Sequence, residues 1–154
     1  MTTRNLAHWL ASAASDPHTV LKCWQAGETA PLLVGRQWDL IELNFTLATA
    51  AITHLKAAER HIGPYLMGGM EHAMWWPLPL HTAHQLADVP GALARPHGSE
   101  IFAPLPGKYL GDRVWVIPEP EGERRNVLTA AGDLRAAVLT AAGQVARGGR
   151  EIAP

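Results

Sequence analysis

The sequence predicts an α+β fold, a central mixed or antiparallel sheet flanked by N-terminal and C-terminal helices. Apolar residues recur at helical spacing near both ends of the chain, and short apolar runs bounded by Gly and Pro occupy the middle. The 154 residues correspond to about one domain. Hydrophobic residues make up 47% and charged residues 18%, which excludes a wholly disordered chain, a coiled coil and a collagen.

The pattern of the N-terminal third of the sequence predicts one helix followed by two strands. Residues 4–14 form the expected amphipathic helix, which ends at Ser15-Asp16-Pro17. Residues 19–24 and 31–34 are short apolar runs with a turn between them, so they are interpreted as strands that could pair as a hairpin.

The segment from Trp38 onward predicts a β-α-β-β core. Residues 38–43 are the first strand, and Asn44 or Thr46 can cap the helix that follows. Gly63-Pro64 is expected to end this helix. Its apolar stripe consists of Leu47, Ala51, Leu55, Ala58 and Ile62.

Two further strands complete this core. Residues 65–67 and 72–77 flank the turn Gly68-Gly69, which predicts an antiparallel hairpin. The short βαβ unit before the turn predicts a right-handed crossover.

The remainder of the chain is less regular because prolines interrupt it. We expect one or two helical turns at residues 81–86. We expect strands at residues 99–103 and 113–117, and a charged exposed loop at residues 118–125. Thr129 is expected to cap a final helix.

The domain is expected to span residues 1–147, with 148–154 as a frayed tail. The apolar face of the final helix is predicted to contain Leu134, Ala137, Val138 and Ala141.

Charge, cysteine content and hydropathy restrict the class of protein. A net charge of −1 argues against a large non-specific nucleic-acid surface, although it allows a local basic patch. The single Cys23 excludes an intrachain disulfide and a cysteine-based zinc site. Polar residues interrupt the N-terminal segment and no stretch approaches a membrane span, so a cytoplasmic protein without a membrane partner is expected.

Several segments, in order, resemble the N-terminal module of actinobacterial bifunctional DNA primase/polymerases, the prim-pol branch of the archaeo-eukaryotic primases. The resemblance spans roughly residues 20–142 and rests on 35–42, 63–64, 75–79, 103–106, 114–118 and 128–129. It implies that the β-α-β-β core is the RRM-like half of a prim-pol fold. It also implies a role in DNA replication, with two Mg²⁺ or Mn²⁺ ions held by acidic residues during nucleotidyl transfer onto a primer.

The acidic set that this resemblance implies is incomplete. The only candidate catalytic and metal-ligating acids before the helix are Asp39 and Glu42, spaced i and i+3, so on a regular strand they face opposite sides. Asp112 is the nearest candidate for the later acid, and His97 is the stand-in for the family's nucleotide-binding histidine. The sequence therefore predicts a degenerate active site, with Mg²⁺ or Mn²⁺ as the ion if any catalysis survives.

The candidate nucleotide-binding residues are Arg95, His97, Trp75 and Arg113. Arginine suits phosphate groups, and an aromatic ring on an open sheet face can stack on a base. Trp75 and Trp76 are adjacent, so they should point to opposite faces, one into a core and the other exposed or covered.

The eight histidines suggest a different kind of site. His81 and His84, spaced i and i+3, could ligate a divalent metal together with His72 or His97. No carboxylate-bearing motif accompanies them, so separate surface histidines are the favoured interpretation.

These observations predict a non-catalytic primase/polymerase-like domain that binds a nucleotide, a nucleic-acid end or a protein partner. Two alternatives remain: an active metal-dependent nucleotidyltransferase using Asp39, Glu42 and His97, and a small regulatory protein that acts as a homodimer.

Overall fold

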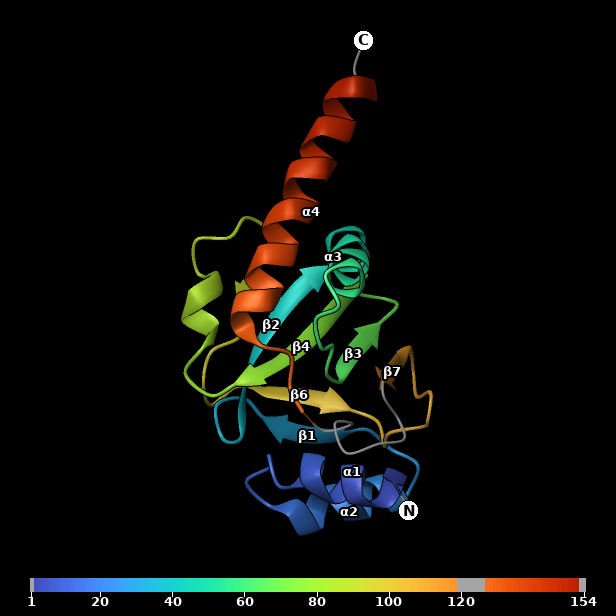
Figure 1. Cartoon of the computed structure of the whole chain (residues 1–154). Helices are drawn as coiled ribbons and strands as arrows, with labels where there is room; N and C mark the ends of the chain where they lie inside the picture. Colours follow the sequence, from blue (N-terminus) through green and yellow to red (C-terminus); the bar gives the residue numbers. More distant parts are fainter. Residues whose placement is uncertain (1, 119–126, 153–154) are drawn as a thin grey trace.

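The computed structural model describes residues 2–118 and 127–152, and the side chains of 6–118 and 127–144. It has the predicted α+β fold (Figure 1). The helices are α1 (Thr2–Ala11), α2 (Pro17–Gln25), α3 (Phe45–Ala57), the 3₁₀ helix η1 (Ala83–Leu86) and α4 (Ala131–Ile152). The strands are β1 (Ala30–Leu33), β2 (Trp38–Asn44), β3 (Tyr65–Gly68), β4 (Ala73–Pro79), β5 (Leu93–Ala94), β6 (Glu100–Ala103) and β7 (Arg113–Val116).

The main sheet has five strands in the order β5-β2-β4-β3-β7, and every adjacent pair is antiparallel. Both β2 and β3 pair with β4, so they run parallel to each other on either side of it. Helix α3 makes the crossover between them. The predicted β-α-β-β core and its hairpin are therefore confirmed, with Met67 opposite Met74 and Gly68 opposite Ala73.

A second sheet consists of β1 and β6 alone. It lies between the α1–α2 pair and the main sheet (Figure 1). The predicted strands 99–103 and 113–117 both form, but β6 belongs to this small sheet whereas β7 is an edge of the main one.

The predicted strand at residues 19–24 is wrong, because this segment forms helix α2. The Oδ1 atom of Asp16 accepts the Thr19 N–H at 3.4 Å, and Pro17 occupies the first turn, where its missing N–H costs nothing. These residues therefore begin a second helix, whereas α1 ends earlier than predicted, at Ala11. The expected hairpin with 31–34 is replaced by the β1–β6 pairing, in which Leu32 lies opposite Ile101.

Helix α3 begins as predicted, since the Asn44 side chain accepts the Leu47 N–H at 2.9 Å. It ends at Ala57, earlier than Gly63-Pro64. Gly63 has a different role: a Cβ there would lie 2.4 Å from the Val127 carbonyl oxygen, so only glycine permits this close approach.

Thr129 was expected to cap the final helix, but α4 begins two residues later, at Ala131. The buried Thr129 hydroxyl instead accepts the Gly63 N–H at 2.8 Å. The backbone of α4 remains helical to Ile152, through much of the tail expected to fray from Gly148. The predicted charged loop lies almost entirely outside the described residues.

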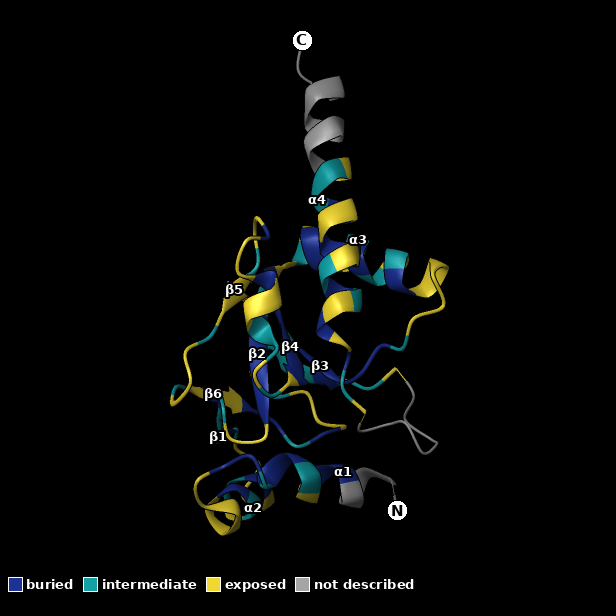
Figure 2. Cartoon of the chain, turned by 60° about the vertical axis from the view of Figure 1, so that its left-hand side comes forward, coloured by how far each residue is buried: buried dark blue, intermediate teal, exposed yellow. Residues whose placement is uncertain are grey.

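The main sheet separates two hydrophobic cores. One contains α1, α2 and the small sheet, packed on the face that carries Leu40 and Trp75. The other contains α3 and α4, packed on the face that carries Ile41 and Trp76. Figure 2 shows the buried strands between these layers. No helix in the described part of the chain is long and apolar enough to cross a membrane.

Trp75 and Trp76 point to opposite faces as predicted, and both are buried, at 2% and 0% exposure. Replacing either by alanine is expected to lower the free energy of unfolding by about 3–5 kcal/mol, because each change leaves a cavity in a core. Chemical denaturation followed by circular dichroism measures this loss. Met70→Ala, at a residue that is 83% exposed, is the control and should change it by less than about 0.5 kcal/mol. A Trp75→Ala protein as stable as this control would contradict the two-core arrangement.

Candidate functional site

Asp39 and Glu42 lie on opposite faces of β2. Their neighbours alternate between the two cores, with Leu40 in the core toward the small sheet and Ile41 in the core toward the helices. The two carboxylates consequently have separate sets of partners, described below as the Asp39 cluster and the Glu42 cluster. Across residues 6–118 and 127–144, no three His, Cys, Asp or Glu side chains are grouped so that they could hold a metal ion.

The Asp39 cluster joins three segments of the chain. The Asp39 side chain is almost fully buried, and its Oδ2 accepts the backbone N–H groups of Thr82 at 3.1 Å and Ala83 at 3.0 Å. Its Oδ1 lies 2.7 Å from Nε2 of His97. One carboxylate therefore ties β2 to the segment after β4 and to the loop between β5 and β6.

The surroundings keep Asp39 ionised. Burial by itself raises the pKa of this carboxyl group, because desolvation disfavours the charge. The hydrogen bonds from the Ala83 N–H, His97 and the His81 backbone lower it, as does the charge of His97, and the net pKa lies below its ordinary value of 3.8.

His97 is half exposed, and its ring packs against the turn that precedes β2. Gly35 in this turn has a φ of +93°, and a Cβ there would lie 2.5 Å from Cγ of the His97 ring. The centroid of the His81 ring lies 5.9 Å from that of His97. The imidazole of His97 is thus held by Asp39 and by the Gly35 turn.

The Glu42 cluster lies across the opposite face of the sheet. Oε1 of Glu42 accepts the indole N–H of Trp75 at 2.7 Å and an N–H of Arg95 at 3.2 Å. The Cζ atom of Arg113 lies 4.7 Å from the Trp75 ring centroid, within the range of a cation–π interaction. Arg113 also donates to Glu71 at 2.9 Å.

The structure thus brings together four of the residues singled out in the sequence: Glu42, Trp75, Arg95 and Arg113. It places Asp39 and His97 elsewhere, in contact with each other. Because Trp75 is buried and lies against the Arg113 guanidinium, its ring is not open for a base to stack on. The side chains of Arg95 and Arg113 remain 32% and 20% exposed.

Asp112, the candidate for the later acid, accepts the backbone N–H of Met70 and so holds the β3–β4 turn. Glu71 in the same turn was not identified from the sequence. Its role depends on the pairing of β3 with β7, which places Gly68 opposite Arg113. A carboxylate next to a Gly-Gly turn is by itself an ordinary surface residue.

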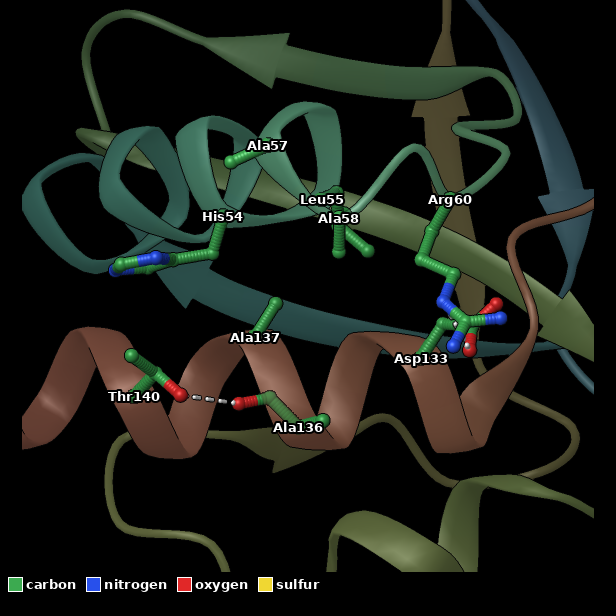
Figure 3. A pocket seen from close by; sticks show the side chains of 9 residues that line it. All are labelled: His54, Leu55, Ala57, Ala58, Arg60, Asp133, Ala136, Ala137 and Thr140. Carbon is green, nitrogen blue, oxygen red and sulfur yellow. Dashed lines mark hydrogen bonds and ion pairs between the residues drawn. The ribbon is translucent and has the colours of Figure 1, made fainter.

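Two hollows lie on the side of the main sheet that α3 and α4 cover, away from both clusters. One, of about 450 Å³, lies between α3 and α4, with His54 toward one end and the Arg60–Asp133 ion pair at the other (Figure 3). The second, of about 600 Å³, lies at the start of α3, where the rings of Phe45 and His72 stack at 5.8 Å. Neither hollow is lined by a residue predicted from the sequence to be catalytic or to bind a nucleotide.

Comparison with known proteins gave no match, whether to protein-family models, to curated proteins or to solved structures.

The Gly35 turn provides a test of how His97 is held. Gly35→Ala and Gly98→Ala both place alanine at a positive φ, which costs roughly 1–2 kcal/mol. Only Gly35→Ala also meets the His97 ring, since a Cβ at Gly98 faces open space. We expect Gly35→Ala to be the less stable variant by about 1–3 kcal/mol in denaturant unfolding, as overpacking costs that much. Equal losses would contradict the contact between Gly35 and His97.

The lowered pKa of Asp39 predicts a loss of stability in acid. As pH falls, Asp39 is protonated at a higher pH in the unfolded chain than in the folded chain. Its carboxylate therefore stabilises the fold at pH values above its ordinary pKa of 3.8, and this stabilisation is lost as pH falls through the lower folded-state pKa. Asp39→Asn should be less stable than the unchanged protein at pH 7. Thermal unfolding between about pH 5 and pH 2 should show this difference shrinking. A constant difference over that range would contradict the assignment.

Proposed function

We propose that this chain is a non-catalytic primase/polymerase-like domain that binds a nucleotide or a nucleic-acid end through Arg95 and Arg113. The β-α-β-β core is the part of the fold that the family resemblance leads one to expect, and it supports this proposal. The observation that carries it is the position of the two arginines in one connected cluster on one sheet face, each partly exposed.

The arginines retain donors for a phosphate group. A guanidinium carries five N–H groups, and Arg95 gives one Nη1 bond to Glu42. Glu42 and Glu71 hold the two side chains in place and balance their charge while no ligand is bound. A phosphate that approaches the remaining N–H groups would gain charge-assisted hydrogen bonds, which are the strong ones in proteins.

The carboxylates favour the non-catalytic form of the proposal. Two-metal phosphoryl transfer places two ions about 3.5–4 Å apart between shared oxygen ligands. Asp39 and Glu42 face opposite sides of β2 and accept hydrogen bonds from different donors. Binding an ion between them would require β2 to change its register or form a bulge.

The ligand proposal is tested by titrating fluorescent nucleotides and single-stranded or recessed DNA ends, followed by anisotropy. Arg95→Ala and Arg113→Ala should each weaken binding about 10- to 100-fold, because a hydrogen bond to a charged group contributes about 1.5–3 kcal/mol. Arg135→Ala is the matched control: this arginine is also paired with a carboxylate, Asp88 at 2.9 Å, but it lies in α4. Its affinity should equal that of the unchanged protein.

Two outcomes would contradict the proposal. Primer extension with Mn²⁺ that is lost in Glu42→Gln would show an active nucleotidyltransferase. No binding of any nucleotide or oligonucleotide, together with a dimer in light scattering, would favour the homodimeric interaction protein instead.

A further inference from the structure

Two histidines distant in the sequence lie together beside Asp39. The ring centroids of His81 and His97 are 5.9 Å apart and their planes are inclined by 54°. His81 follows β4, and His97 lies in the loop between β5 and β6. We propose that these two imidazoles bind one transition-metal ion of the Cu²⁺ or Zn²⁺ type, independently of the nucleotide site proposed above.

The spacing of the rings suits a shared ion. With metal–nitrogen distances of about 2.0–2.1 Å and near-tetrahedral angles, two imidazoles on one ion have centroids roughly 5–6 Å apart. The observed separation lies at the upper end of this range, and the His81 side chain is exposed.

Asp39 orients His97 for ligation. Nε2 of His97 lies 2.7 Å from the ionised carboxylate and donates to it, so in the neutral ring Nδ1 carries the lone pair that a metal ion needs. Metal-binding histidines almost always donate their second ring N–H to a carboxylate, a carbonyl or a water in this manner. The Gly35 turn restrains the same ring from another side.

Asp39 also fixes the backbone that carries His81. Its Oδ2 accepts the N–H groups of the next two residues, Thr82 and Ala83. His81 itself has a φ of +66°, a conformation that residues other than glycine rarely adopt. Such strained residues persist where the surrounding structure holds them, and they are concentrated at functional sites.

The donor set determines the kind of ion. Imidazole nitrogen suits Cu²⁺, Zn²⁺ and Ni²⁺, whereas Mg²⁺ and Mn²⁺ prefer oxygen ligands. No third His, Cys, Asp or Glu completes the site in the part of the chain whose side chains are described, so water would fill the other coordination positions. The proposed ion therefore differs in chemistry from the pair implied by the primase resemblance.

The test is a Cu²⁺ titration of the full chain, purified without a histidine tag, at one equivalent of metal. Electron paramagnetic resonance should show two imidazole nitrogens on the copper, and calorimetry gives the affinity. His81→Asn should weaken binding about 100-fold or more, because two tethered ligands typically raise affinity by about 10²–10⁴. Asparagine is chosen because it tolerates a positive φ, so the turn can be retained.

His84→Asn is the matched control, since this exposed histidine lies in η1, only three residues from His81. It should bind copper as the unchanged protein does. Asp39→Asn, checked for folding by circular dichroism, should weaken binding about 10- to 100-fold while both imidazoles remain. Equal affinity in the unchanged protein and His81→Asn, or a spectrum with a single imidazole nitrogen, would overturn the proposal.

Discussion

The buried carboxylate of Asp39 is hydrogen-bonded to two connections that lie beside β2 in the fold but far from it in the sequence. A charge with so little exposure is costly unless several donors compensate for its lost hydration. Two backbone N–H groups and one imidazole do so, and they come from the segment after β4 and from the loop between β5 and β6. Satisfying one anion therefore fixes the positions of His81 and His97 and the path of two connections around β2.

The alternation of side chains along β2 separates the two carboxylates of this strand. Asp39 and Glu42 are only three residues apart, yet the strand directs them to opposite faces. One carboxylate organises histidines, and the other organises Trp75 and Arg95. This division gives the protein two polar clusters of different character, one with imidazoles and one with guanidinium groups. We have proposed an ion of the Cu²⁺ or Zn²⁺ type for the first and a phosphate ligand for the second.

Burial also limits what each cluster can do. Trp75 is covered by Arg113 and holds Glu42 through its indole N–H, so it acts as a support for the charged side chains and not as an open stacking platform. The two arginines keep exposed edges, although Arg113 donates to the Phe102 carbonyl as well as to Glu71. The groups on this face that remain able to bind a ligand are therefore the guanidinium groups of the two arginines.

The amino-acid sequence alone determined the α+β class, the β-α-β-β core, a helix cap at Asn44 or Thr46, and the divergence of Asp39 and Glu42. All of these depend on local periodicity or on residues adjacent in the chain. It did not determine that 19–24 is helical, since Asp16 and Pro17 suit the end of one helix as well as the start of another. Nor did it determine the β1–β6 pairing, the Asp39–His97 contact or the meeting of Arg95 with Glu42. These contacts join residues separated by 53 to 73 positions, and only tertiary packing decides which segments meet.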